Sequence, residues 1–199
     1  MIKSDRWLRQ HGPDIIQPFQ PYQIRAQAND FGEEYKVISY GVSSFGYDIR
    51  LSGSEFDVFS AIGASEVDPK SFDPKCLVGA VMERDQSTGA WYWKMPAHSY
   101  ALGVSLETFD IPCNVACLCV GKSTYARSGL IVNTTPLEPG WRGKLVLEFS
   151  NPTDLPIRLY INEGIAQIIF FESDENCEIS YADRSGKYQD QIGVTLARV

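Results

Sequence analysis

Runs of alternating apolar and polar residues, separated by turn signals, recur along most of the chain. Residues 100–107, 145–149 and 157–161 alternate in this way, and 165–171 form a compact apolar run. Period-two alternation is typical of β-strands with one buried face. No long apolar stripe of helical period follows the first dozen residues, so short strands must build the core. The pattern predicts a mainly β fold, a β-barrel or a jelly-roll-like fold, with few short helices.

Two local elements and the domain organisation are also predicted. Residues 4–10 favour a short N-terminal helix, with Ser4 as N-cap and Gly12 near its end. Residues 82–94 favour a hairpin whose aromatic residues are interpreted as packing. No repeat or Pro/Ser-rich linker divides the 199 residues. We therefore expect one domain over residues 1–199, with the polar segment 183–199 as a mobile tail or lid.

The charge distribution limits the partners of the chain. Its 18 basic and 25 acidic residues give a net charge of −7, which disfavours nucleic acid as a partner. Residues 121–147 contain four basic residues and one acidic residue, a segment that suits a small anion such as a triphosphate. No apolar run could span a bilayer, and the N-terminus lacks the apolar core of a signal peptide. We expect a cytoplasmic protein with no membrane partner.

The cysteines and histidines do not predict a zinc site. Five cysteines, an odd number without a secretion signal, indicate free thiols. Zinc-dependent base deaminases combine H-x-E with P-C-x-x-C. Here the cysteine cluster 113–119 is spaced C-x3-C-x-C, and neither His11 nor His98 begins H-x-E. No metal ligand is therefore predicted.

Residues 121–129 follow the strand predicted at 115–120, which is expected to be buried. Ser123 or Thr124 could cap a helical turn that ends near Gly129, and Arg127 would share a face with both. Lys122 lies beside the free N–H groups at the start of this turn, a geometry that suits phosphate. An ordinary capped turn with surface charges explains the same residues equally well.

Glu148 is a carboxylate within an otherwise apolar strand. If Leu145, Leu147 and Phe149 face the core, Val146 and Glu148 face the other way. The usual interpretation is a solvated strand residue. The alternative is a carboxylate that faces a pocket, where burial raises its pKa and makes it a general base at neutral pH.

Five motifs in a fixed order support the second interpretation. They are G-K-S-T-x-A-R-x-G from 121, V-N-T-T-P-x-E-P-x-W from 132, L-E-F-S-N from 147, N-E-G-x-A-Q-x-x-F-F-E-S-D-E from 162, and Y-A-D-R-x-G-K-Y-x-x-Q-x-G-V-T-L from 181. With residues 39–50, they make the chain resemble bacterial dCTP deaminases. The resemblance is weakest at 76–97, where the chain has extra hairpin residues.

The resemblance implies a fold, an activity and an assembly. The fold would be the distorted jelly-roll of trimeric dUTPases, and the chain would form homotrimers whose active sites lie between subunits. The reaction would be hydrolysis of dCTP to dUTP and ammonia, a supply of dUTP for dUMP and dTTP synthesis. No zinc would take part, and Mg²⁺ would be bound through the substrate triphosphate. Feedback inhibition by dTTP is a further candidate property.

The resemblance also assigns roles to individual residues. Glu148 matches the general base, and Ser123 and Arg127 match the residues that position the attacking water and steady the glutamate. The stretch that would meet the triphosphate contains Lys122, Ser123, Thr124 and Arg127. Glu138 would lie near the sugar hydroxyl, and Trp141 would pack near the deoxyribose. The backbone around Val146 and Leu147 would contact the edge of the base. The other matched contacts are Tyr125, Ala126, Gln167, Tyr181, Lys187 and Gln191, the last two on the C-terminal segment that would close over the phosphates.

Two other functions compete with this hypothesis. A dUTPase would carry an Asp on the hairpin that here reads Leu137-Glu138-Pro139, but a bifunctional enzyme that releases dUMP from dCTP is harder to exclude. A non-catalytic nucleotide-binding module would need no base. The joint presence of Ser123, Arg127 and Glu148 argues against that module.

Overall fold

The structure is a computed structural model that describes residues 1–29, 31–62 and 64–198. Short strands dominate, with few helices, as the alternation predicts. The helical elements are α1 (Asp5–Ile15), the 3-10 turn η1 (Pro74–Cys76) and α2 (Ser123–Ala126). The strands are β1 (Ile16–Gln17), β2 (Ile24–Ala28), β3 (Glu34–Ser43), β4 (Gly46–Phe59), β5 (Leu77–Gly79), β6 (Met82–Arg84), β7 (Trp91–Met95), β8 (Ser99–Asp110), β9 (Val115–Gly121), β10 (Ile131–Val132), β11 (Thr135–Leu137), β12 (Arg142–Asn151), β13 (Ile157–Tyr160) and β14 (Gly164–Glu172).

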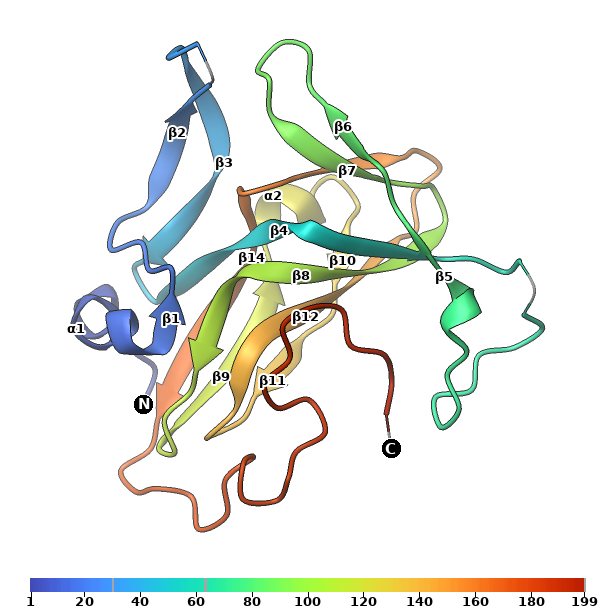
Figure 1. The fold of residues 1–199 in the computed structure, drawn as a ribbon. Coiled ribbons are helices and arrows are strands. Elements are labelled where there is room, and N and C mark those ends of the chain that lie inside the picture. The colour runs from blue at the N-terminus through green and yellow to red at the C-terminus, as the bar shows by residue number, and fades with distance from the viewer. Residues whose placement is uncertain (30, 63, 199) are drawn as a thin grey trace.

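One large antiparallel sheet curls on itself and determines the architecture (Figure 1). Its strands follow the order β10-β12-β8-β4-β14-β9-β11. Since β10 and β11 are consecutive in the chain, the short segment 131–137 joins the two ends of this path. A second, small sheet has the order β13-β7-β6. The prediction of a mainly β, jelly-roll or barrel-like fold with few short helices is confirmed.

The core lies inside the curl, where the strands direct alternate side chains inward. Phe56 of β4 stacks on Trp93 of β7 at 5.8 Å and meets Phe149 of β12 at 5.7 Å between ring centroids. Burial of each large apolar side chain contributes about 2 kcal/mol to stability. In β12, Leu145, Leu147 and Phe149 are buried, as predicted. The inward residues therefore fix which residues of β12 face outward.

Strand β9 is only half buried, which corrects one prediction. Cys117 and Cys119 are buried, whereas Leu118 between them is 37% exposed. Apolar residues on both faces suggested a fully buried strand. The structure shows instead that only one face of β9 is covered.

Helix α1 begins where the sequence predicts but continues to Ile15, beyond the expected end at Gln10. Gly12 lies within the helix, and the Phe19 ring packs so closely against it that a β-carbon there would come within 2.3 Å of that ring. Ser4 is the N-cap residue, although its side chain makes no capping hydrogen bond. Among the described residues, no helix is long and apolar enough to cross a membrane.

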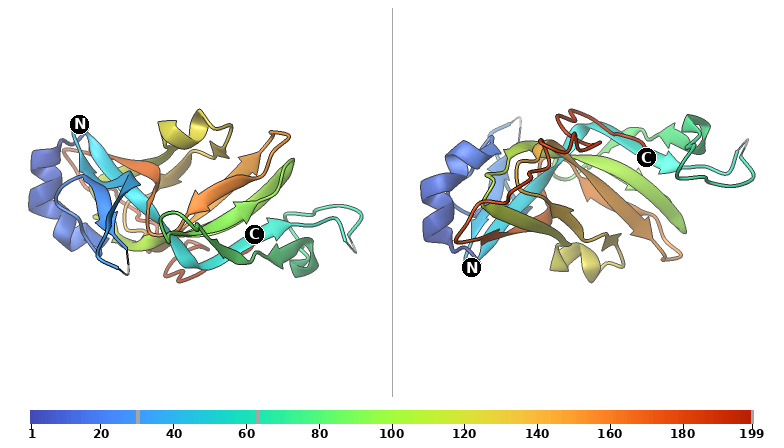
Figure 2. Two further views of the ribbon diagram at one scale, coloured as in Figure 1. Left: turned by 90° about the horizontal axis from the view of Figure 1, so that it is seen from above. Right: turned by 90° about the horizontal axis from the view of Figure 1, so that it is seen from below.

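The hairpin predicted at 82–94 is confirmed as β6 and β7, which pair antiparallel from Met82 with Trp93 to Arg84 with Trp91. Figure 1 shows it projecting on the same side as the β2–β3 hairpin. The views in Figure 2 place α1 at one end of the molecule and the segment around β5 at the other. The hairpin thus extends the small sheet through its contact with β13.

Glu163 is buried in the turn before β14, and its carboxylate accepts a 2.7 Å hydrogen bond from the backbone N–H of Ile38. Burial raises the pKa of Glu163 from its ordinary value of 4.5 to about 7. The folded chain therefore keeps a proton that the unfolded chain releases within this pH window. Its stability should fall as the pH rises from 4.5 through 7.

We expect Glu163→Gln to remove this pH dependence. The glutamine side chain still offers an oxygen to Ile38 but has no proton to release. At pH 8 the variant should be more stable than the wild type by up to about 3 kcal/mol, the free-energy equivalent of the shift. Denaturant unfolding at pH 5 and pH 8 measures the difference. A variant with the same pH slope as the wild type would contradict this assignment.

Candidate active site

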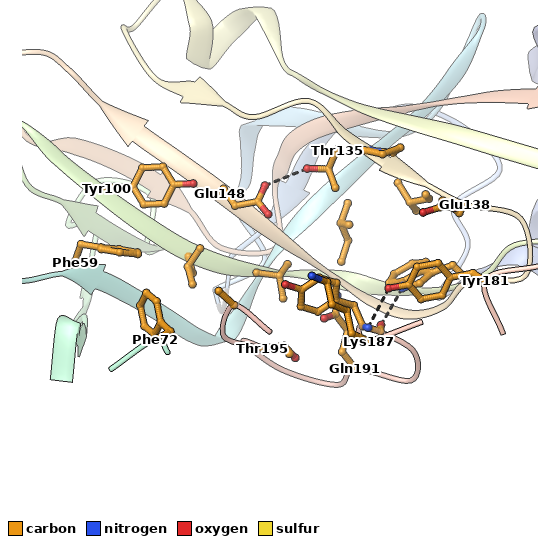
Figure 3. A pocket seen from close by; sticks show the side chains of 18 residues that line it. Phe59, Phe72, Tyr100, Thr135, Glu138, Glu148, Tyr181, Lys187, Gln191 and Thr195 are labelled. Atoms are coloured by element: carbon orange, nitrogen blue, oxygen red, sulfur yellow. Dashed lines mark hydrogen bonds between the residues drawn. The ribbon is translucent and has the colours of Figure 1, made fainter. Parts of the chain in front are cut away.

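A cavity of about 480 Å³ lies between the outward face of β12 and the C-terminal tail, residues 183–198 (Figure 3). Its walls come from the end of β4, from β8, β11 and β12, from the tail and from neighbouring loops, and are mostly apolar or aromatic. The lining residues are Phe59, Phe72, Tyr100, Leu102, Thr135, Pro136, Leu137, Glu138, Trp141, Leu145, Val146, Glu148, Tyr181, Lys187, Tyr188, Gln191, Thr195 and Ala197. Seven of the predicted site residues are therefore together: Glu138, Trp141, Val146, Glu148, Tyr181, Lys187 and Gln191.

Glu148 points into this cavity between Tyr100 and Thr135 (Figure 3). The Thr135 hydroxyl donates a 3.0 Å hydrogen bond to Glu148 Oε2. Burial raises the pKa of Glu148, and the Thr135 hydrogen bond opposes part of that rise. Burial raises the pKa of Tyr100, and the nearby Glu148 charge raises it further. Glu148 therefore has the environment of a general base whose pKa is displaced toward neutrality.

Three aromatic rings form a wall beside Glu148 that the sequence analysis missed. The Phe59 ring meets Tyr100 edge-on at 5.0 Å and Phe72 edge-on at 5.8 Å. The amide of Asn133 donates a 3.1 Å hydrogen bond to the Tyr100 hydroxyl. Tyr100 could have been found, since it lies on one face of its strand with Leu102. Phe59 and Phe72 come from the end of β4 and from a loop, and offered no such signal.

The C-terminal tail is held over the cavity by contacts to the start of β12. The Trp141 indole donates a 2.9 Å hydrogen bond to the backbone oxygen of Tyr188, and Arg142 forms a 2.6 Å ion pair with Asp190. Gln191 and Lys144 exchange two hydrogen bonds of 2.8 Å. Whether this tail acts as a lid stays a prediction, and the last residue of the predicted segment 183–199, Val199, lies outside the described residues.

The predicted sugar contacts lie beneath the tail. Trp141 is only 4% exposed and packs beside Phe109. Glu138 forms an ion pair with Arg184, whose guanidinium also lies over the Tyr181 ring. The tail and the residues it covers therefore share polar contacts, and a ligand entering the cavity would meet both.

The segment 122–127 lies outside this cavity. It forms α2, with Lys122 as N-cap and no capping hydrogen bond from a side chain, so the predicted capping by Ser123 or Thr124 is wrong. Gly129 ends the turn with a φ of +91°, as predicted. Within the described residues, neither Ser123 nor Arg127 lines the cavity that contains Glu148.

Four further predicted contacts also lie outside the cavity. Tyr125 is buried, and its hydroxyl accepts a 2.9 Å hydrogen bond from the backbone N–H of Tyr160. Leu147 faces the core. Ala126 ends α2. Gln167 lies on β14 and, with Lys122, bonds to Asp48. The predicted site residues of one chain therefore form two separate groups, one in the cavity around Glu148 and one around α2 and Asp48.

Comparison with known proteins identifies the family. Residues 2–173 match the model of the dCTP deaminase-like family. The dCTP deaminase of Chromobacterium violaceum is 51% identical and covers 99% of this chain and 98% of its own length. That of Alcanivorax borkumensis is 54% identical with the same coverage. The chain belongs to the dCTP deaminase family. The family and the enzyme class expected from the motifs are confirmed.

Comparison of solved structures supports the fold of this dCTP deaminase family member. The 2'-deoxycytidine 5'-triphosphate deaminase of Agrobacterium tumefaciens superposes with a TM-score of 0.53 at 17% identity. The match covers 86% of this chain, which spans 48% of that longer protein. At this identity the likeness concerns the fold alone. It agrees with the curled sheet described above.

The donor groups of this dCTP deaminase family member do not form a metal centre in the described part of the chain. No cluster of three or more His, Cys, Asp or Glu side chains that could hold an ion occurs there. Cys117 and Cys119 are buried on β9, while Cys113 is exposed. The zinc-free chemistry suggested by the sequence stays a prediction.

Proposed function

We propose that this enzyme hydrolyses dCTP to dUTP and ammonia with Glu148 as general base. The observation that supports this most directly is the position of Glu148: a half-buried carboxylate with a raised pKa in an apolar cavity. The cavity's size suits a nucleoside, and its aromatic wall suits a flat base. The single cytoplasmic domain expected from the sequence remains part of the proposal.

The proposed reaction needs one group that accepts and returns a proton. Ionised Glu148 takes a proton from the attacking water as the water oxygen bonds to C4 of cytosine. The proton passes to ring nitrogen N3, which gives a tetrahedral intermediate. Glu148 then transfers the second proton of the water to the amine, the C4–N4 bond breaks, and ammonia leaves. The products are dUTP and ammonia, and Glu148 returns to its starting state.

We infer that a neighbouring subunit completes each site. Ionised Glu148 places a negative charge in an apolar cavity, and a nearby guanidinium would stabilise this ionised form. Arg127 and Ser123 fit that role by resemblance but lie outside the cavity of their own chain. A homotrimer whose subunits pair the cavity of one with α2 of the next would bring the two groups together.

Mg²⁺ would accompany the substrate as the counterion of the triphosphate. Mg²⁺ prefers hard oxygen ligands, which the triphosphate and water would supply, so the proposal assigns the ion no protein ligand. The ion would neutralise phosphate charge, while Lys122 and Lys187 would contact the phosphates. We expect turnover to survive zinc chelation, and we include dTTP as a candidate feedback inhibitor.

Separation of the products by chromatography tests this proposal against its alternatives. Purified protein is incubated with dCTP and Mg²⁺, and ammonia is measured in parallel. Formation of dUTP with equimolar ammonia supports the proposal. Formation of dUMP and pyrophosphate would indicate a bifunctional enzyme, and binding without products would indicate a nucleotide-binding module.

Deletion of residues 183–199 should raise the KM for dCTP by about tenfold or more, because it removes Lys187 and Gln191 and opens the cavity. Asp190→Asn is the matched control: its ion pair with Arg142 is half exposed on both sides, so we expect a change below about threefold. Steady-state kinetics on folded protein measures both. A truncated enzyme with the wild-type KM would show that the tail is no lid.

A further inference from the structure

Asp48 of β4 is a buried carboxylate on which three side chains converge. It is 2% exposed. Its Oδ2 accepts hydrogen bonds from Lys122 Nζ at 2.6 Å and from Gln23 Nε2 at 3.1 Å. Its Oδ1 accepts one from Gln167 Nε2 at 3.2 Å. A buried carboxylate stays ionised only when such donors surround it. The three donor side chains are in turn held in place by their hydrogen bonds to Asp48.

The sheet brings these residues together from three adjacent strands, β4, β14 and β9. Asp48 lies directly opposite Gln167 in the register of β4 and β14. Lys122 follows Gly121, the last residue of β9, which pairs with Ala166 of β14. The Lys122 side chain therefore reaches across β14 to Asp48, and its end is fixed on a rigid part of the sheet.

We propose that Asp48 is a positioning residue for nucleotide binding, which acts by holding Lys122 and Gln167 in place. The inference rests on the proposed function, because only resemblance assigns these two residues to the nucleotide. A lysine ammonium has three N–H donors, and Asp48 takes one of them. Within the described part of the chain, Asp48 is the one hydrogen-bond acceptor of the Lys122 ammonium, so its other N–H groups can bind phosphate oxygens. A flexible stem that is already ordered loses less conformational freedom when the ligand binds.

The amide of Gln167 is oriented by the same carboxylate. Its Nε2 donates to Asp48 and also to Ser43 Oγ at 2.9 Å. Because the amide nitrogen faces these two acceptors, the carbonyl oxygen points away from them. Asp48 thereby fixes which end of the amide a ligand meets. Loss of the charge would free both the Lys122 ammonium and the Gln167 amide.

Asp48 does not line the cavity that contains Glu148. Its effect should therefore fall on nucleotide affinity and leave the chemical step almost unchanged. Asp48→Asn keeps the shape of the side chain and removes its charge. We expect the Kd of dCTP, measured by titration calorimetry with Mg²⁺, to rise about tenfold to thirtyfold. We expect kcat to change by less than about threefold.

Glu107→Gln provides a matched control for the loss of a buried charge. Glu107 is fully buried and forms a 2.7 Å ion pair with Arg50, but it contacts neither Lys122 nor Gln167. Both variants should lower the melting temperature, and only Asp48→Asn should weaken dCTP binding. Equal effects of the two variants on Kd would reduce Asp48 to a structural role and overturn the proposal.

A double-mutant cycle with Lys122→Met shows whether Asp48 acts through its partners. In that background Asp48→Asn should raise Kd by less than about threefold, since the main positioned group is gone. The same factor in both backgrounds would overturn the proposal. If Asp48→Asn does not fold, Ser43→Ala releases the Gln167 amide without touching the charge, and an unchanged Kd would count against the proposal.

These outcomes are distinguishable from a failure of the proposed function. A wild type that binds dCTP but makes no dUTP rejects deamination, while the affinity of Asp48→Asn still decides the role of Asp48. A wild type that turns dCTP over, with a variant of unchanged Kd, rejects the role of Asp48 alone. A wild type that binds no nucleotide overturns both.

Discussion

Glu148→Gln is expected to abolish ammonia release from dCTP while leaving dCTP binding nearly unchanged. The glutamine amide keeps the size of the side chain and its oxygen can still accept the hydrogen bond from Thr135. It cannot take a proton from water, so the loss in kcat should reach at least about 10³-fold. A coupled ammonia assay and calorimetric dCTP binding measure the two effects separately.

Glu163→Gln is the matched control for this experiment. Glu163 is also a buried glutamate with a raised pKa, but it lies outside the cavity that contains Glu148. The Glu163→Gln variant should therefore release ammonia from dCTP at the wild-type rate. If Glu148→Gln retains ammonia release, another group must activate the water, and the assigned role is wrong.

The acid limb of the pH–rate profile provides a second readout of Glu148. Catalysis needs its ionised form, and burial raises its pKa above the ordinary 4.5. The rate should therefore fall, as the pH decreases, at a higher pH than a solvated carboxyl would give. A limb at or below 4.5 would contradict a buried base.

The sequence predicted the strands because their alternation reflects local burial. The face of β12 that bears Glu148 followed directly from the inward positions of Leu145, Leu147 and Phe149. The end of α1 did not, because Gly12 looks like a helix stop and its role depends on the distant Phe19 ring. A glycine near the end of a predicted helix can mark its stop or, as here, a close approach of another side chain, and the local sequence does not distinguish the two.

The candidate site was predictable only in part, for a similar reason. Motifs identified residues by type and spacing, but spacing does not show which residues share a cavity. Phe59 at the end of β4 and Phe72 in the following loop line the same cavity as Glu148 through tertiary packing, which no local pattern records. The sequence places Asp48 within the motif at residues 39–50 but does not show that it pairs with Gln167 across two strands.

Arg127→Ala is expected to lower turnover of dCTP by about three orders of magnitude, the cost typical of a charged group that stabilises a developing charge. Arg127 does not line the cavity of its own chain, so this loss would have to act on the Glu148 of a neighbouring subunit. Steady-state ammonia release measures it. Arg158→Ala is the control, since Arg158 is exposed and its ion pair with Asp85 lies outside both the cavity and the tail. Near-normal turnover in Arg127→Ala would remove Arg127 from the mechanism.

Mixed trimers test the subunit arrangement directly. Coexpressed Arg127→Ala and Glu148→Gln chains are each inactive alone, but a cavity from the first can meet α2 of the second. Random assembly of equal amounts would restore both groups in about a quarter of the sites of a closed symmetric ring. Recovered activity near that fraction requires Glu148 and Arg127 to come from different chains. No recovery, with mixed trimers demonstrated by mass spectrometry, would place both residues in one subunit and contradict the proposed assembly.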